Sequence, residues 1–198
     1  MMIGKMASAA KGLLRKEIAK KLELIPIEER KRQSEIVKEK LFNLPEFQKS
    51  KRVSVFLSLD TEIDTEPIVR KIFEDGKECF VPRYSKAGMQ MVKLKSMEDW
   101  ETLPVTKWNI KQPSLKDNRE DALQTGGLDF IVSPGVAFTK KGGRLGHGGG
   151  YYDRFFKQVR SGQSHPVHFV GVAFKEQILE EIPLEETDVI IDKVLYAD

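Results

Sequence analysis

A short segment rich in glycine constrains this chain more than any other feature. Residues Gly142–Gly150 hold six of the fifteen glycines and run directly into Tyr151, Tyr152 and Asp153. A flexible linker has no reason to place one arginine, Arg144, among its glycines or to end in an aromatic pair and a carboxylate. We call Gly142–Gly150 the glycine segment. It is therefore expected to form a defined turn rather than a flexible linker.

The flanks of the glycine segment predict a strand before it and a helix after it. Residues 128–135, LDFIVSPG, have the apolar β-formers of a buried strand, and residues 151–160 have the pattern of a helix. A glycine-rich turn between them lets backbone N–H groups approach an anion at the positive end of the helix dipole. The first hypothesis is a phosphate cradle in which Arg144 supplies a planar donor fork. On the glycines alone, a plain loop that needs positive φ is equally well supported.

The glycine segment matches neither of two familiar phosphate-binding patterns. Gly143 and Gly148 have the spacing of a P-loop, but Gly149 and Gly150 stand where lysine and serine or threonine belong. A dinucleotide fingerprint requires glycine or alanine at position 151, which is Tyr151. The residues therefore indicate an anion site of another type.

Outside the glycine segment, the chain alternates buried strands with helices. The expected helices span about 9–25, 27–42, 66–75 and 151–160, the first two being separated at Pro26. The expected strands lie near 52–58, 79–83, 91–95, 128–133, 168–174 and 189–195. This alternation is typical of a layered α/β domain with a mostly parallel sheet flanked by helices. The long irregular region 96–127 has the character of a lid or binding segment.

The composition is that of an ordinary globular protein and excludes several functional classes. With 198 residues, 40% of them apolar, the chain can bury a core and is expected to form one domain, residues 1–198. Its 33 basic and 30 acidic groups give a net charge of +3, which is too balanced for a typical nucleic-acid binder. No apolar run approaches the roughly 18 residues that span a bilayer, so no membrane partner is expected.

Two basic residues near the start of the chain are expected to point inward. The first helix has an apolar stripe formed by Leu14, Ile18, Leu22 and Ile25. Lys11 and Arg15 fall on or beside this stripe rather than opposite it. Such residues need a buried anion or a route by which their charged ends reach water, and for an isolated pair the second is commoner.

Several polar residues follow the expected strands, at the edge of a parallel sheet where ligands bind. Glu62 comes after the first strand, and Arg83 and Tyr84 come after the second. Taken alone, Glu62 is better explained as one of several acids around the start of the next helix. Asp153 has the same simple explanation at the helix that follows the glycine segment.

The glycine segment and its surroundings resemble the signature of the 5-formyltetrahydrofolate cyclo-ligase family. This resemblance rests on residues 129–138, DFIVSPGVAF, and 143–153, GRLGHGGGYYD. Similar motifs follow in order along nearly the whole chain: AKGLLR at 10–15, EER at 28–30, KRVSVFLS at 51–58 with Glu62, FVPRY at 80–84, WNIKQP at 108–113, AFKEQ at 173–177, Asp188, and VLY at 194–196. Their extended forms are more similar to the animal enzymes than to the bacterial ones.

The resemblance implies a ligase of one-carbon metabolism that uses ATP and Mg²⁺. The implied reaction converts 5-formyltetrahydrofolate to 5,10-methenyltetrahydrofolate and releases ADP and phosphate. ATP and the formyl folate are the implied small-molecule partners. The implied fold is a single α/β domain similar to the sugar-isomerase and CoA-transferase group.

The resemblance also implies roles for individual residues. The nucleotide-binding set is Lys11, Arg15, Arg144, Leu145, Gly146, His147, Gly148, Gly149, Gly150 and Tyr152. The substrate-binding set is Leu57, Glu62, Trp108, His147 and Tyr151. Asp153 and Asp188 are the implied metal ligands, with Asp192 as an alternative to Asp188. Arg144 is the implied catalytic residue, because it would neutralise charge on the phosphoryl group in transfer.

Two residues of the glycine segment depart from the family pattern. His147 stands where relatives commonly have tyrosine or arginine, and Gly149 stands where some animal relatives have lysine. A neutral histidine would neutralise less phosphoryl charge than an arginine, so more would fall to Arg144. Two other functions stay open: a non-catalytic folate or nucleotide binder on the same scaffold, and a kinase that acts on another small molecule.

The expected location is the cytoplasm. The single cysteine, Cys79, cannot form an internal disulfide and lies in an apolar stretch, which favours a buried thiol in a reducing compartment. The first sixteen residues lack acids and carry four basic residues, a composition faintly similar to a transit peptide. The family resemblance begins within that segment, at Ala10, and so favours mature structure.

Overall fold

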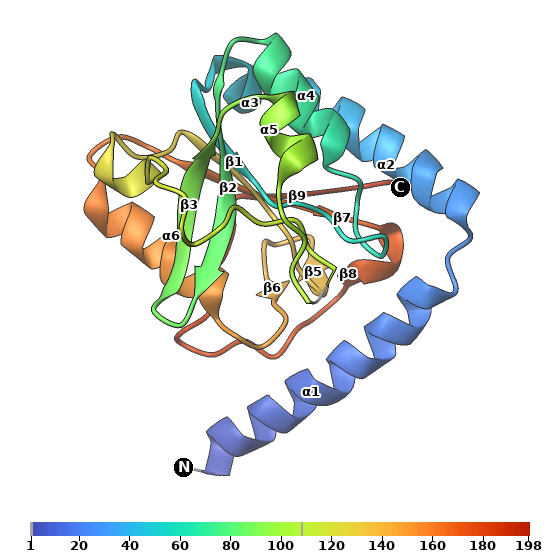
Figure 1. Ribbon diagram of the computed structural model, residues 1–198. Coiled ribbons are helices and arrows are strands. Elements are labelled where there is room, and N and C mark those ends of the chain that lie inside the picture. Colours follow the sequence, from blue (N-terminus) through green and yellow to red (C-terminus); the bar gives the residue numbers. More distant parts are fainter. Residues whose placement is uncertain (1, 108) are drawn as a thin grey trace.

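A six-stranded sheet forms the centre of the computed structural model, which describes residues 2–107 and 109–198 (Figure 1). Its strands lie in the order β3 (Gly88–Leu94), β2 (Glu78–Ser85), β1 (Arg52–Val55), β4 (Phe130–Ser133), β7 (His168–Ala173) and β9 (Lys193–Tyr196). β3 is antiparallel to β2, and the other neighbouring pairs are parallel. The α/β class with a mostly parallel sheet is therefore confirmed.

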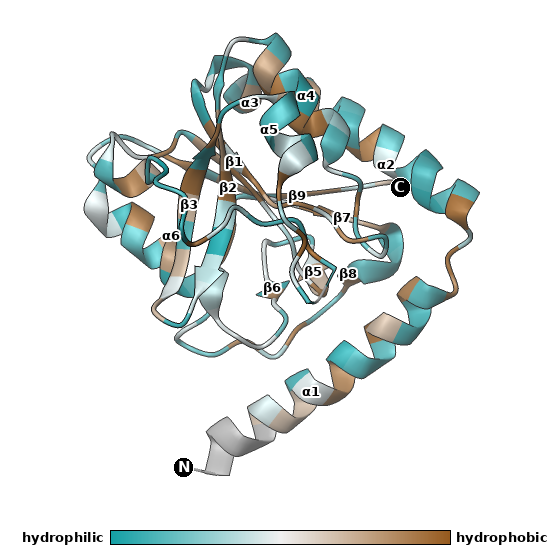
Figure 2. Cartoon of the chain, in the orientation of Figure 1, coloured by the Kyte–Doolittle hydropathy of each residue, from teal (hydrophilic) through white to brown (hydrophobic). Residues whose placement is uncertain are grey.

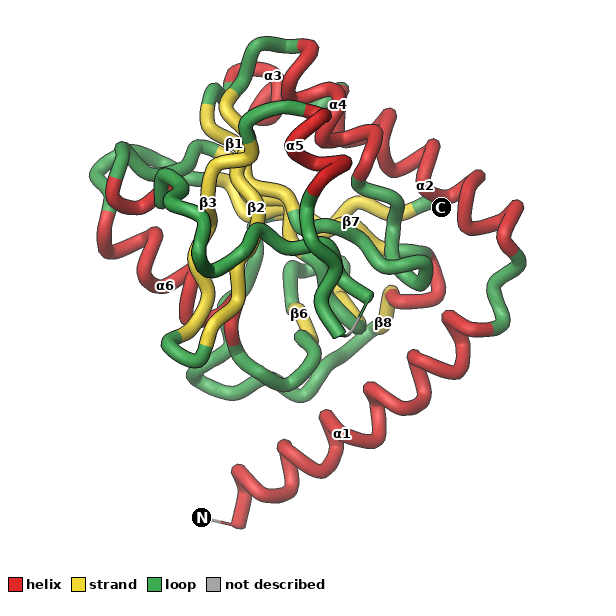
Figure 3. The backbone as a smooth tube through the Cα atoms, viewed as in Figure 1, coloured by secondary structure: helices red, strands yellow, loops and turns green. Residues whose placement is uncertain are grey.

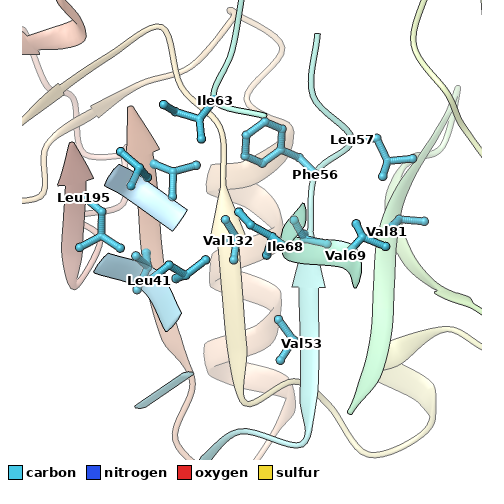
Figure 4. Close-up of a cluster of buried hydrophobic side chains, with 14 of the residues drawn as sticks. Leu41, Val53, Phe56, Leu57, Ile63, Ile68, Val69, Val81, Val132 and Leu195 are labelled. Carbon is cyan, nitrogen blue, oxygen red and sulfur yellow. The ribbon is translucent and has the colours of Figure 1, made fainter. Parts of the chain in front are cut away.

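Helices cover both faces of this sheet. They are α1 (Met2–Glu23), α2 (Ile27–Phe42), α3 (Pro45–Lys49), α4 (Glu66–Glu74), α5 (Met97–Thr102) and α6 (Tyr151–Gly162), with short 3-10 turns η1 (Ala122–Gln124) and η2 (Lys175–Gln177). α2, α3 and α4 bury their apolar sides in one core cluster, and α6 buries its own in a second. In the first cluster, Val53 and Val132 of the sheet lie beside Ile68 of α4 (Figure 4). The apolar residues of the sheet lie between mostly hydrophilic helix exteriors (Figure 2).

The first helix runs along the outside of this layered body (Figure 3). It begins at Met2 rather than near residue 9, because the acid-free stretch before Ala10 contains good helix formers. The apolar stripe predicted for it is buried at Ile18, Leu22 and Ile25. Among the described residues, no helix combines the length and the hydropathy needed to cross a bilayer.

Several strand boundaries differ from those expected from sequence. β1 ends at Val55 rather than near 58, because none of the next three residues pairs with a neighbouring strand: Phe56 packs in the core, and Leu57 and Ser58 line a pocket. Arg83 and Tyr84 lie inside β2, not after it, since antiparallel pairing with β3 continues to Ser85. β9 begins at Lys193 rather than near 189.

The glycine segment is not the simple strand-to-helix turn that was expected. It contains a two-residue strand, β6 (Arg144–Leu145), which pairs with β5 (Ala137–Thr139) in a small second sheet completed by β8 (Ile178–Leu179). Strands this short have no recognisable hydrophobic period. Their effect is to fix Arg144 in the fold before the glycines reach α6.

Candidate active site

The carboxyl ends of the parallel strands bring the candidate residues to one edge of the sheet. The chain leaves β1 toward Glu62 and leaves β4 at Pro134, beside which the glycine segment returns. Tyr84, near the end of β2, packs edge-on against Tyr151 at the start of α6, with 5.1 Å between the ring centroids. The fold thus brings these candidate residues to the edge at which ligands bind in such sheets, and their roles stay predictions.

The last glycines of the segment form an open turn at the N-terminus of α6. Gly148 and Gly150 have φ angles of 107° and 64°, which side chains with a Cβ rarely adopt. A Cβ on Gly149 would approach the Tyr151 ring to 2.6 Å. Gly146, His147, Gly148 and Gly149 are not covered by the core, so their backbone groups are accessible to a ligand. The turn is therefore a cradle that substitution by larger residues would fill.

Arg144 lies under this turn and is fixed from several sides. Only 4% of the residue is exposed, and its guanidinium donates to Pro134 O at 3.1 Å and to Asp153 Oδ2 at 2.8 Å. The same guanidinium lies 5.5 Å from the Tyr152 ring centroid. Its Nε is buried without a hydrogen-bond partner among the described residues. Arg144 is therefore held by an ion pair to Asp153, while its Nε–H group remains available to a ligand.

Two predicted nucleotide-binding residues on α1 meet the other side of the site. Arg15 Nε donates to Gly146 O at 2.8 Å, so α1 holds the glycine segment directly. Lys11, 7% exposed, donates to Glu185 Oε2 at 2.7 Å and to Asp188 Oδ2 at 2.5 Å. The buried anion that the inward position of Lys11 requires is thus supplied by the protein itself.

The two candidate metal ligands are adjacent and both are paired with cations. Asp153 Oδ1 accepts the Val189 N–H at 2.9 Å. This bond holds Val189, and with it the preceding Asp188, against the start of α6. Asp153 pairs with Arg144 and Asp188 pairs with Lys11. Asp192 accepts the Phe169 N–H at 2.7 Å, near the first residue of β7 and therefore at the opposite edge of the sheet. This placement favours Asp188 over Asp192 as the second candidate.

His147 is surrounded by positive charge. Although the residue as a whole is exposed, neighbouring atoms partly desolvate its imidazole, and this desolvation, followed by the charges of Arg144 and Arg15, lowers the pKa of His147 below its usual value. Because a neighbouring cation disfavours the imidazolium, His147 is neutral in the resting site at neutral pH. Arg144 is consequently the charged donor in the centre of the glycine segment.

Glu62 and Leu57 line a pocket that lies after the end of β1. Its volume is about 710 Å³, and its wall also includes Trp100, Asn109 and Lys111. Glu62 Oε2 accepts the Leu59 N–H at 2.8 Å. Burial nevertheless raises the pKa of the Glu62 carboxyl to about 7, and the hydrogen bond from Leu59 only partly opposes this shift. Such a carboxyl can change protonation state near neutral pH when a ligand arrives.

The tyrosine pair that opens α6 divides between two environments. Tyr152 is buried, and its hydroxyl interacts with that of Tyr84. Tyr151 is 36% exposed and stacks its ring against the Arg154 guanidinium. Burial raises the pKa of Tyr84 to about 12, so its phenol remains a donor at neutral pH. The charges of Glu62 and Arg144 both act on this phenol, which therefore connects the pocket to the glycine segment.

The residues present fit a phosphate-bearing ligand. Arg144 Nε is a buried donor without a partner among the described residues, and it lies beside a turn of accessible glycines. Unpaired buried donors cost free energy until a ligand satisfies them. No group of three or more candidate metal ligands occurs among the described residues. Mg²⁺ needs only one or two protein carboxylates when phosphate oxygens and water complete its shell, so this does not argue against it.

The site contains residues that sequence reasoning missed. Glu185 neutralises Lys11, and Trp100 and Asn109 contribute to the wall of the pocket around Glu62. The residue type at Asn109 could have suggested a tight turn, because asparagine is one of the non-glycine residues that most often adopt a positive φ. Its φ in the structure is 60°. Trp108, predicted to bind substrate, lies outside the described residues.

Replacing Glu62 with glutamine should make the ligand-free protein more stable at alkaline pH. The folded carboxyl has a pKa near 7 against an ordinary value of 4.5. Folding therefore favours the protonated form, and stability falls as the pH rises from about 4.5 through about 7. Glutamine stays neutral and keeps an acceptor for Leu59. Melting curves should place the variant above the parent at pH 8 and level with it at pH 4.5; an equal gap at both would contradict the burial effect.

Comparisons with known proteins agree with this geometry. Residues 7–197 match the model of the 5-formyltetrahydrofolate cyclo-ligase family. A mouse protein named 5-formyltetrahydrofolate cyclo-ligase is 46% identical over 193 residues, covering 96% of this chain and 95% of the mouse protein. A Caenorhabditis elegans protein, named a probable 5-formyltetrahydrofolate cyclo-ligase, is 44% identical over 85% of this chain and 84% of its own length.

Solved structures give the same result. The structure of Aquifex aeolicus 5,10-methenyltetrahydrofolate synthetase superposes with a TM-score of 0.76 at 33% identity, covering 93% of this chain and 88% of that one. A Mycoplasma pneumoniae 5,10-methenyltetrahydrofolate synthetase shares the fold, with a TM-score of 0.68 at 20% identity over 94% of this chain and 98% of its own. Sequence, fold and comparisons together place this chain in the 5-formyltetrahydrofolate cyclo-ligase family.

Proposed function

We propose that this protein converts 5-formyltetrahydrofolate to 5,10-methenyltetrahydrofolate, using ATP and Mg²⁺ and releasing ADP and phosphate. The observation that carries the proposal is the glycine cradle with a buried, unpartnered donor, Arg144 Nε, at the edge of the sheet where Glu62 lines a pocket. Membership of the cyclo-ligase family supplies the substrate.

The chemistry of the reaction explains why no activated nucleophile is needed. A formamide oxygen is a poor leaving group, so the γ-phosphoryl group of ATP is first transferred to it. The second folate nitrogen then forms a bond to the activated carbon, and phosphate departs with the former formyl oxygen. The enzyme has to align the formyl oxygen with the phosphoryl group and neutralise charge in the transition state. Arginine and backbone N–H groups are suited to both tasks.

The nucleotide half of the proposed site comprises the glycine segment and the start of the chain. Gly146–Gly150 would donate backbone N–H groups to the phosphates, with Arg144 and Tyr152 beneath and Lys11 and Arg15 beside them. Bound Mg²⁺ would neutralise phosphate charge, held by Asp153 and Asp188. Because both acids are paired with cations in the ligand-free protein, nucleotide binding is expected to redistribute these pairs.

The folate half is proposed to occupy the pocket lined by Leu57 and Glu62. An ionised Glu62 would accept two hydrogen bonds from the amino and ring N–H edge of the pterin. Tyr151 offers an exposed aromatic face for a flat ring. The role of Trp108 in binding the folate stays a prediction. The single domain 1–198, the cytoplasmic location and the absence of a nucleic-acid partner also stay predictions for the protein as a whole.

Phosphate release should be strictly coupled to the formyl folate. Purified protein with Mg²⁺ and ATP is expected to form the methenyl chromophore and phosphate in equal amounts when 5-formyltetrahydrofolate is added, and neither without it. Omission of Mg²⁺ should abolish both signals. Rapid ATP hydrolysis without the folate, and no chromophore with it, would favour a different phosphotransferase. Folate and ATP binding without any turnover would instead indicate a non-catalytic binder.

A further inference from the structure

The described residues of the segment 104–112, which are 104–107 and 109–112, form the two arms of a small hairpin along the wall of the pocket. Its base is closed by a hydrogen bond from Gln112 N to Pro104 O at 3.0 Å and by a bridge between Val105 and Lys111. Thr106 N donates to Ile110 O at 2.8 Å closer to the tip. Val105, Asn109 and Lys111 of this hairpin, which we call the 104–112 hairpin, line the same pocket as Glu62.

The side chain of Gln112 joins this hairpin to the central sheet. Its Oε1 accepts the Tyr84 N–H at 3.0 Å, and its Nε2 donates to Tyr84 O at 3.2 Å. The pairing of β1 with β2 reaches only Ser54 opposite Phe80, so the edge of β2 at Tyr84 faces no strand. The amide of Gln112 therefore satisfies both backbone groups of Tyr84 as a neighbouring strand would.

Adjacent residues strengthen the attachment on both sides of Gln112. Lys111 Nζ donates to Trp100 O at 2.9 Å and Glu101 O at 3.1 Å, at the end of α5. Arg83, buried in β2, donates to Ser114 O at 3.2 Å. The side chain of Gln112 bonds to Tyr84, the residue that contacts the Tyr151 ring and on which the charge of Glu62 acts. This amide thus connects the hairpin to the centre of the site.

We propose that Gln112 is a positioning residue for the folate: it fixes the 104–112 hairpin as the pocket wall facing Glu62 and holds Tyr84 in register with it. This inference rests on the proposed function. The hairpin is expected to act more on the folate half of the site than on the nucleotide half, because the described hydrogen bonds of Gln112 run to Tyr84 and Pro104, and the nucleotide half is reached only indirectly, through Tyr84.

The chain offers a matched control in Gln163. Its Oε1 accepts the Leu128 N–H at 2.9 Å and its Nε2 donates to Leu128 O at 2.8 Å, the same pair of bonds to one backbone residue. Gln163 follows α6 and lies far along the chain from the pocket wall. Gln163 Nε2 also donates to His165 O at 3.1 Å, so Gln163→Ala removes three side-chain hydrogen bonds and Gln112→Ala removes two. The control variant should therefore lose at least as much thermal stability as Gln112→Ala.

Steady-state kinetics separate a positioning role from a structural one. Gln112→Ala should raise the KM for 5-formyltetrahydrofolate about tenfold, equivalent to about 1.4 kcal/mol. Its kcat and its KM for ATP should change by less than about threefold, because Gln112 makes no direct hydrogen bond to the nucleotide half. Gln163→Ala should leave all three near the parent values. If the two variants behave alike while the parent turns over normally, the positioning role is wrong and the proposed function stands.

Hydrogen exchange tests the hairpin without relying on activity. In the parent, adding 5-formyltetrahydrofolate alone should slow exchange of the Thr106, Gln112 and Tyr84 amides, since a bound folate would pack against the hairpin. The Leu128 amide should not change. Uniform exchange at these amides with and without a saturating folate would contradict the inference, even if Gln112→Ala failed to fold.

Discussion

Replacing Arg144 with alanine is expected to lower turnover by about 10³-fold, by analogy with other arginines that contact phosphoryl groups in transfer. The guanidinium is buried beneath the glycine cradle and retains an unpaired Nε, so it is already oriented when charge develops. The affinity for ATP should fall only modestly, because backbone N–H groups and Mg²⁺ still hold the ground-state triphosphate. Single-turnover rates with saturating Mg²⁺ and ATP measure the first effect, and calorimetric titration measures the second.

The same substitution should also destabilise the fold. Arg144 pairs with Asp153, whose side chain is only 14% exposed, and removal of one partner leaves a poorly solvated charge. Breaking a buried ion pair of this kind costs about 3–5 kcal/mol. Rates must therefore be compared well below the melting temperature of the variant.

Arg144→Lys separates charge stabilisation from the structural role. Lysine can keep the pair with Asp153 and most of the stability, but a point charge cannot reproduce the planar fork. We expect near-parent melting with only partial recovery of turnover. An Arg144→Ala protein that melts and turns over like the parent would defeat the catalytic and the structural interpretation together.

The sequence predicted the fold best for elements long enough to show a repeating pattern of apolar residues. The alternation of apolar strands with helices predicts the parallel sheet, and the stripe on α1 predicts the burial of Lys11. It failed for β5, β6 and β8, because strands of two or three residues carry no period and are formed by tertiary contacts. It also placed the end of β1 too late, since apolar residues that line a pocket have the same composition as those that continue a strand.

For the site, the sequence predicted which residues meet but not how their charges are balanced. The glycine segment, Arg144 and Asp153 are local in sequence, so their proximity could be anticipated. The pairing of Lys11 with Glu185 and Asp188 joins residues more than 170 positions apart, and no local pattern contains it. The same holds for the amide of Gln112 on Tyr84, which depends on where β1 ends.

Asp153→Asn should lower activity about 10²-fold at limiting Mg²⁺, the scale on which support of a metal site is usually lost. Asparagine can still accept the Val189 N–H through its amide oxygen, but it removes the charge that would bind the ion and leaves Arg144 facing an amide. Part of the loss should be recovered by raising the Mg²⁺ concentration, because weakened binding is offset by mass action. The dependence of the initial rate on Mg²⁺ concentration is the measurement.

Asp188→Asn and Asp192→Asn are the comparison variants for this prediction. Asp188 adjoins the Val189 N–H bonded to Asp153, so its variant should also shift the Mg²⁺ dependence, accompanied by weaker ATP binding as Lys11 loses a partner. Asp192 accepts the Phe169 N–H at the other edge of the sheet, so its variant should lose stability while its Mg²⁺ dependence stays that of the parent. An identical Mg²⁺ dependence in all three variants would remove both candidate ligands and leave the ion bound by phosphate oxygens and water alone.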